Sequence, residues 1–343
     1  MNAAELETDS ERLKALAEHI EPAEKVLIVT HDFPDPDCLG ASFGLSLLFT
    51  DAMGVKEVTI AHGGFVGRAE NRAMVRHLGI FLQPLCYCDL SAYDRVVVVD
   101  ALPGAANISL PPETSVHAVF DHHLGTPPEN AGYFYDVRKN AGAVSTVVTG
   151  YLAEAGIIIP PLVATGLFYG IKTDTAGLSR DAFDDDVNAY KLLFDLCDHG
   201  VLTKIEHPER GAEFFITIHH AASRMQIFGN AAHVFVGAVS TPDYVGEMAD
   251  FFLCLKDLEW VVTGGVFGET LFYSVRAKTL ETAGKAAEKI GVLMGGSGGG
   301  HGRIGAGRVD AAGLSDPAGA LKAAFLNVLE IEGQKPVSLL DLK

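Results

Sequence analysis

The sequence predicts an α/β protein with a doubly wound, mostly parallel sheet and a second, smaller α/β domain across a cleft. Strands and helices alternate over the first two-thirds of the chain, and several strands are short, continuous apolar runs. The 343 residues exceed what one core usually serves. We therefore predict a first domain at 1–198, a linker and connecting helix at 199–229, and a second domain at 230–335.

The first domain opens with Lys25–Thr30, a β-branched run typical of a buried parallel strand. A break at His31–Pro34 precedes a helical pattern from Leu39 to about Ala52. The other expected strands are Glu57–Ala61, Arg95–Val99 and Ser115–Phe120, and the other expected helices are Ala69–Leu78, Ala143–Ala155, Leu162–Ile171 and Asp185–Asp198.

The second domain follows a connecting helix expected at Glu213–Met225. Its expected strands are Ala232–Ser240, Trp260–Phe267 and Thr270–Arg276, and its expected helices are Pro242–Leu253, Leu280–Ile290 and Pro317–Leu329. A glycine cluster, Gly295–Gly307, separates the last two helices and is expected to be a loop.

Charge and cysteine usage restrict the class of protein. The formal net charge is -18, from 44 acidic and 26 basic residues, which argues against long polyanions such as duplex nucleic acid as partners. Five scattered cysteines favour a reducing cytoplasm, and Cys86 and Cys88 have no second pair to complete a zinc site. No leader-like segment and no membrane-spanning run are visible, so we expect no membrane association.

Acidic residues and histidines gather where the predicted strands end. They are His31, Asp35 and Asp37 after the first strand, Asp100 after Arg95–Val99, Asp121, His122 and His123 after the next strand, and Asp174 at the end of a helix. In a parallel sheet the loops after the strands line one crevice. We therefore expect these side chains to meet at one edge of the sheet.

Four carboxylates in one place are costly unless cations neutralise them. Asp35, Asp37, Asp100 and Asp174 together carry a charge that two divalent ions would balance, and imidazole with carboxylate suits Mn²⁺. Two such ions can activate a water for attack on a phosphate. A single Asp after a strand is more often a cap or turn residue, and a buried His is usually a hydrogen-bonded core residue. Their ordered coincidence in one domain favours the metal site.

At these residues the sequence resembles the DHH phosphoesterases, which include RecJ nucleases, family II pyrophosphatases, exopolyphosphatases and nanoRNase/pAp phosphatases. The matching motifs are His31–Asp37 (HDFPDPD), Val97–Asp100, Asp121–His123 and Gly170–Thr175 (GIKTDT). The resemblance implies one metal held by His31, Asp35 and Asp100 and another held by Asp37, Asp100, His122 and Asp174. It further implies that Asp121 orients the histidines and that His123 faces the substrate phosphate as a donor or general acid.

The second domain resembles the DHH-associated C-terminal domain at Ser274–Arg276 and at Gly298–His301. The resemblance implies a substrate-binding set of Arg276, Gly299, Gly300, His301 and Arg303. Successive glycine N–H groups can form a nest for an anion, although a bare glycine run is more often a surface loop. The same run lacks the strand, helix and ribose-binding acid of a dinucleotide-binding fingerprint.

The resemblance implies a phosphoric ester hydrolase with two divalent ions, most simply Mn²⁺. We expect substrates among bisphosphorylated nucleotides, dinucleotides and RNA fragments of two to five residues. The segment after Asp100 has no Arg, and the tail Gly302–Gly307 departs from the usual small residues, so substrate identity stays open. The alternatives are an inorganic polyphosphate hydrolase, a nucleotide-binding sensor without turnover, and a RecJ-like exonuclease. A homodimer is also left open.

Overall fold

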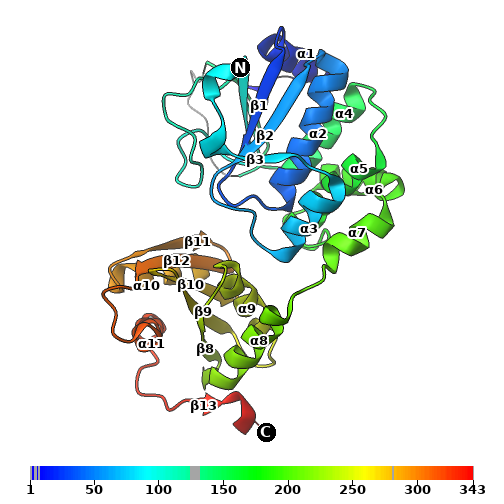
Figure 1. The fold of residues 1–343 in the computed structure, drawn as a ribbon. Coiled ribbons are helices and arrows are strands. Elements are labelled where there is room, and N and C mark those ends of the chain that lie inside the picture. The colour runs from blue at the N-terminus through cyan, green and yellow to red at the C-terminus, as the bar shows by residue number, and fades with distance from the viewer. Residues whose placement is uncertain (1, 4–5, 7, 124–131, 280–281, 343) are drawn as a thin grey trace. The chain divides into compact units, whose positions relative to one another are not determined.

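The computed structural model describes residues 2–3, 6, 8–123, 132–279 and 282–342, with only the backbone at His301. The chain folds as two compact units, Met1–Pro208 and Glu209–Lys343 (Figure 1). The boundary falls inside the segment predicted as linker and connecting helix. That segment forms α7 (His199–Glu206) in the first unit and α8 (Ala212–Arg224) in the second.

The first unit is built on a parallel sheet with the strand order β3-β2-β1-β4-β5-β6. The strands are β1 (Lys25–Thr30), β2 (Glu57–His62), β3 (Leu82–Pro84), β4 (Arg95–Val99), β5 (Ala118–Asp121) and β6 (Phe134–Val137). The predicted α/β class with a parallel sheet is confirmed. Strand order reverses between β1 and β4, and at such a switch point the loops after the two strands diverge and open a crevice.

Helices pack on one face of this sheet (Figure 1). They are α1 (Asp9–Ile20), α2 (Pro36–Met53), α3 (Ala69–Leu78), α4 (Val144–Glu154), α5 (Pro161–Asp174), α6 (Asp184–Leu196) and α7. Val26 and Ile28 of β1 point into this core, whereas Leu27 and Val29 point to the other face. Among the described residues, that other face is covered by 3₁₀ turns at Leu85–Tyr87 and Leu90–Ala92 and by the segment after β4.

The start of α2 differs from the prediction in a way that matters for the site. The helix begins at Pro36 rather than Leu39, because Asp35 is its N-cap and its side chain accepts the backbone N–H of Asp37 and of Cys38. Proline at the first helical position has no N–H to leave unpaired. Asp37 and Cys38 therefore lie in the first turn of a helix and not in a loop.

Helices α2 and α5 cross at two glycines. A Cβ added at Gly40 would lie 2.4 Å from the carbonyl oxygen of Gly166, so glycine is what lets the two backbones touch. This contact holds the end of α5 against the start of α2, and both helix ends carry predicted site residues.

The second unit is a mostly antiparallel sheet with the order β11-β12-β10-β9-β8-β7-β13, in which β8 and β9 are parallel. The strands are β7 (Gln226–Phe228), β8 (Ala231–Ala238), β9 (Trp260–Phe267), β10 (Thr270–Ala277), β11 (Ser297–His301), β12 (Ile304–Asp310) and β13 (Val337–Ser338). One apolar core lies beneath α10 (Ala283–Leu293) and α11 (Pro317–Val328), and another beneath α8 and α9 (Asp243–Leu253). Leu280 and Glu281, where we predicted the start of α10, lie outside the described residues.

The glycine cluster is not a loop: it forms the hairpin β11–β12, and the loop prediction was wrong. A Cβ at Gly298 would lie 2.2 Å from the Ala287 carbonyl oxygen, and one at Gly305 would lie 2.3 Å from the Ala283 carbonyl oxygen. The glycines therefore allow the hairpin to pack directly on α10, a close backbone approach that overrides their low strand propensity. Among the described residues, no helix combines the length and the hydropathy needed to cross a membrane.

The α2–α5 crossing predicts that Gly40→Ala is destabilising. The added methyl would force two backbones apart, and overpacking of this kind costs about 1–3 kcal/mol in the free energy of unfolding. Gly150→Ala in α4 is the matched control, because its Cβ would meet nothing within 4 Å. It should be neutral or stabilising by up to about 1 kcal/mol. Urea unfolding followed by circular dichroism measures both, and equal stability of the two variants would contradict the packing argument.

The second unit buries His233 in β8 with 4% of its surface exposed, and neither ring nitrogen has a hydrogen-bond partner among the described residues. Burial, and then repulsion by Lys322, lower its pKa from 6.5 to about 4. The unfolded chain therefore binds a proton more readily than the folded one. The stability that this histidine contributes is complete above pH 6.5 and is lost as the pH falls toward 4.

We expect the free energy of unfolding to fall by about 2–3 kcal/mol between pH 6.5 and 4 because of His233 alone. Carboxylates titrate in the same range, so the contribution is the difference between the wild-type protein and His233→Leu. The variant should show a flatter dependence of stability on pH. Parallel pH profiles for the two proteins would show that His233 is not the cause.

Candidate metal centre

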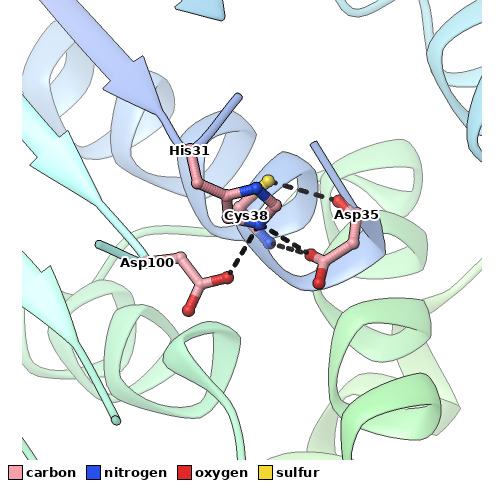
Figure 2. A group of neighbouring side chains, drawn as sticks. All are labelled: His31, Asp35, Cys38 and Asp100. Carbon is pink, nitrogen blue, oxygen red and sulfur yellow. Dashed lines mark hydrogen bonds and ion pairs between the residues drawn. The ribbon is translucent and has the colours of Figure 1, made fainter. Parts of the chain in front are cut away.

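The first motif follows β1. His31 comes directly after the strand, and its Nε2 lies 3.8 Å from Asp35 Oδ1 and 3.4 Å from Asp100 Oδ2 (Figure 2). Asp35 is held by its role as N-cap, with its Oδ1 accepting the N–H groups of Asp37 and Cys38 at 3.1 Å each. The cap hydrogen bonds fix where this carboxylate points before any ligand arrives.

Asp37 is fully buried and is held by another helix end. Its Oδ2 accepts the N–H of Val144 at 2.6 Å and its Oδ1 accepts the N–H of Ser145 at 2.8 Å, both in the first turn of α4. Unpaired N–H groups and the helix dipole make a helix N-terminus a favourable place for a carboxylate. The negative charge of Asp37 is thus partly compensated by the backbone.

Asp100 follows β4 and is 2% exposed. Its φ is 61°, a left-handed conformation that aspartate and asparagine adopt more readily than most residues. Its N–H donates to the carbonyl oxygen of Phe120 at 2.8 Å, which ties it to β5. Backbone strain of this kind persists where surrounding contacts fix it, and it gathers at functional sites.

The Asp-His-His motif begins at the last residue of β5. Oδ1 of Asp121 accepts the N–H of His122 at 2.8 Å and the N–H of His123 at 3.1 Å, and it lies 2.7 Å from Nδ1 of His123. Asp121 therefore holds the backbone of His122 and both the backbone and the ring of His123, and its orienting role stays a prediction. Its hydrogen bond is the main reason that the pKa of His123 is raised.

Asp174 is the last residue of α5 and completes the group around His122. His122 Nε2 lies 3.2 Å from Asp174 Oδ2, 3.5 Å from Asp100 Oδ1 and 3.9 Å from Asp37 Oδ2. Three carboxylates thus surround one imidazole nitrogen. The site is built from the ends of three neighbouring strands and two helix ends.

Three overlapping groups of donor atoms each lie within 4.8 Å of one another. They are His31, Asp35, Cys38 and Asp100; Asp100, His122 and His123; and Asp37, His122 and Asp174. Two donors bound at about 2.0–2.2 Å to one ion lie about 3.0–3.5 Å apart. The separations of 3.2–3.5 Å between His122 or His31 and the nearest carboxylates match donors around a shared ion.

Two buried polar atoms at the centre have no hydrogen-bond partner among the described residues: Oδ1 of Asp100 and Nε2 of His122. A buried polar atom without a partner costs about 1–3 kcal/mol. Both atoms belong to the donor groups, and both would be satisfied by coordinating a cation. The residues present therefore fit divalent ions.

The titration behaviour of the centre reflects an excess of negative charge. Burial raises the pKa of Asp174, and repulsion by Asp35 and Asp100 adds to it, giving a value of about 6. Burial lowers the pKa of His122, but Asp100 and Asp174 outweigh it and raise that pKa to about 12. Burial, then Asp174 and Asp100, raise the pKa of Asp37. A protein without metal therefore holds protons here, and metal binding must release them.

All six residues predicted as metal ligands meet in this one centre, together with the predicted catalytic residues Asp121 and His123. The predicted substrate-binding residues lie in the second unit. Arg276 is buried on β10, where its side chain donates to Asp250 and to Oγ of Ser274. Arg303 is exposed in the turn between β11 and β12, Gly299 and Gly300 are in β11, and the side chain of His301 lies outside the description. Their role in substrate binding stays a prediction.

Sequence reasoning missed two features of the centre. One is the pair of backbone N–H groups of Val144 and Ser145, which no residue type in the sequence announces. The other is Cys38, whose sulfur belongs to the donor group of His31. Its position in the sequence could have indicated it as a donor, because it lies three residues after Asp35 and next to Asp37.

The shared position of Asp100 predicts the metal stoichiometry of two variants. Asp100→Asn keeps the shape and tolerates the left-handed backbone but removes the charge common to both ions. It should therefore lower the affinity for both ions by at least about tenfold. Asp35→Asn keeps the helix cap and should lower the affinity for one ion only. Equilibrium dialysis with Mn²⁺ and elemental analysis measure this, with Asp51→Asn on the exposed end of α2 as control. Equal losses in the Asp100 and Asp35 variants would contradict the bridging position.

Residues 25–171 match the family model of the DHH family, N-terminal domain. An uncharacterized protein of Methanocaldococcus jannaschii, MJ1633, is 34% identical over 257 residues, covering 74% of this chain and 52% of the relative. A probable manganese-dependent inorganic pyrophosphatase of Streptococcus agalactiae is 25% identical over 174 residues, covering 50% of this chain and 55% of the relative. This chain thus spans about half the length of these relatives.

Among solved structures, an exopolyphosphatase-related protein of Bacteroides fragilis shares the fold. Its TM-score is 0.73 at 16% sequence identity, with 93% of this chain and 98% of that chain covered. The matched family segment begins at β1 and ends in α5, so it contains the first three predicted motifs and stops just before Asp174. Residues 25–171 of the chain thus match the DHH family, N-terminal domain, in agreement with the resemblance of the motifs.

Proposed function

We propose that this protein is a metal-dependent phosphoric ester hydrolase that acts on small nucleotides or very short oligonucleotides. The observation that carries the proposal is the pair of donor groups joined at Asp100, with two buried polar atoms that coordination of a cation would satisfy. Together the donor groups bring four carboxylates and three imidazoles into one centre. The match of residues 25–171 to the DHH family model supports the same reaction class.

We assign two divalent ions to the centre. Mn²⁺ is the ion that we assign to the His122 group, which consists of Asp37, His122 and Asp174, with Asp100 3.5 Å from His122. That group offers imidazole nitrogen and carboxylate oxygen, which suit manganese, and one relative is named as manganese-dependent. When bound, such ions lower the pKa of a water and stabilise negative charge on a phosphoryl group. The residues of the chain fix the positions of these ions through the two helix N-termini and the strained backbone at Asp100.

His123 is the residue that we assign to proton transfer. Its side chain is half exposed, whereas those of His31 and His122 are largely buried, so it can reach a bound phosphate ester. Asp121 holds its Nδ1, which leaves Nε2 to face the substrate. The hydrogen bond to Asp121 raises the pKa of His123, so the ring is suited to donate a proton to the oxygen of the leaving group.

The substrate class follows from charge. A chain with a net charge of -18 repels long polyanions but tolerates a short one at a site that cations neutralise. We infer bisphosphorylated nucleotides, dinucleotides and RNA of two to five residues as substrates, and no long duplex or membrane as partner. Five free cysteines support a cytoplasmic location.

A hydrolysis panel with Mn²⁺ tests this proposal. It compares a 3′,5′-bisphosphorylated nucleotide, a linear dinucleotide, RNA of two to five residues, a longer RNA strand and inorganic polyphosphate. We expect turnover of at least one short nucleotide and none in Asp100→Asn. Turnover that survives in this variant would reject the mechanism. Cleavage of polyphosphate alone, or of longer RNA alone, would overturn the substrate class, and tight binding without turnover would favour a sensor.

A further inference from the structure

We propose that Cys38 is a ligand of the metal centre, so that the His31 group binds a thiophilic dication such as Zn²⁺ or Co²⁺ in preference to Mn²⁺. This inference rests on the metal centre of the proposed function. It concerns one half of the centre, because the His122 group has only nitrogen and oxygen donors. The centre would then hold two chemically different ions.

The geometry of the His31 group supplies four different donors in one place. The ligand atoms of His31, Asp35, Cys38 and Asp100 all lie within 4.8 Å of one another (Figure 2). One imidazole nitrogen, one sulfur and two carboxylate oxygens make a complete four-coordinate set of the kind that zinc prefers. Without the sulfur, three protein ligands would remain.

The backbone directs the thiol toward this group. Cys38 lies in the first turn of α2, and its N–H donates to Oδ1 of Asp35, so the two residues are held together. Its Sγ donates a long hydrogen bond of 3.4 Å to the carbonyl oxygen of Asp35. An S–H group is a weak donor, so exchanging this bond for a metal costs little. Burial raises the pKa of the Cys38 thiol to about 12, so a bound metal has to displace its proton.

A second observation concerns the buried carboxylate of the same donor group. Asp100 belongs to this group and is 2% exposed, and its Oδ2 lies 3.4 Å from Nε2 of His31. Its other oxygen, Oδ1, faces His122 and His123 and has no hydrogen-bond partner among the described residues. That buried carboxylate joins the two groups. The thiol therefore shares its donor group with a buried carboxylate that also faces the other half of the centre.

The competing explanation is that Cys38 is only a small core residue. Its side chain is fully buried and belongs to the apolar cluster beneath the helices. A packing role predicts that alanine or serine would leave the bound metal unchanged. A role as an exposed redox thiol does not fit a side chain with no accessible surface. Metal spectroscopy separates packing from coordination.

Ligand chemistry sets the direction of the metal preference. Thiolate selects thiophilic ions, whereas carboxylate and imidazole alone accept manganese. Removing the sulfur should therefore lower the affinity for Zn²⁺ or Co²⁺ and leave the affinity for Mn²⁺ nearly unchanged. We expect the Zn²⁺-to-Mn²⁺ affinity ratio to fall at least about tenfold in Cys38→Ala.

The experiment uses the full chain, stripped of metal and loaded with Co²⁺, and needs no enzymatic activity. A sulfur-to-cobalt charge-transfer band in the near ultraviolet is expected in the wild type. It should vanish in Cys38→Ala and Cys38→Ser while the visible ligand-field bands of bound cobalt persist. Cys197→Ala is the matched control, because Cys197 is another buried cysteine in the same unit and lies outside the donor groups.

The possible outcomes are distinct. A charge-transfer band that survives in both Cys38 variants, or cobalt bound by the wild type without such a band, would overturn the proposal and leave the metal centre standing. No bound cobalt in the wild type would overturn this inference, and a matching failure to bind Mn²⁺ would remove the metal centre as well. If circular dichroism shows that Cys38→Ala disturbs folding, the charge-transfer band of Cys38→Ser decides the question, because serine keeps the size and a polar atom.

Discussion

The structure of the first unit depends on balancing negative charge that is buried at the switch point of a parallel sheet. Asp37 and Asp100 are inaccessible, and Asp174 is mostly covered, yet all three approach His122. A cluster of this kind is stable only with cations among its members, either protons on the histidines or metal ions. The raised pKa of His122 is the sign that protons take this place when metals do not.

The fold meets this requirement before any ion binds. The order β3-β2-β1-β4-β5-β6 brings the ends of β1 and β4 side by side, so His31 and Asp100 become neighbours although they lie far apart in the sequence. Two helix N-termini then receive carboxylates, α2 at Asp35 and α4 at Asp37. Backbone amides and helix dipoles thus offset part of the charge and hold the donors at fixed positions.

The strands and the ordered acids could be predicted because they depend on local pattern. Apolar runs and strand-terminal aspartates are visible in the sequence, and the predicted bounds of β1 and β4 agree with the structure. The hydrogen bond that holds Asp37 could not be predicted, because its donor is the backbone N–H of Val144, which lies 107 residues away. The hairpin β11–β12 was missed because its glycines are required by close packing on α10, and the sequence of the hairpin does not show that tertiary contact. Strand β6, Phe134–Val137, is too short to show a pattern.

The N-cap and the first turn of α2 contribute residues to both halves of the centre. Asp35 and Cys38, three residues apart, belong to the His31 group, whereas Asp37 belongs to the His122 group. The sulfur of Cys38 belongs only to the His31 group, so removing it takes a donor from that group and none from the other. A single substitution there can therefore change which ion one half of the centre prefers, while Asp37, Asp100 and the histidines keep the arrangement on which phosphate chemistry would depend.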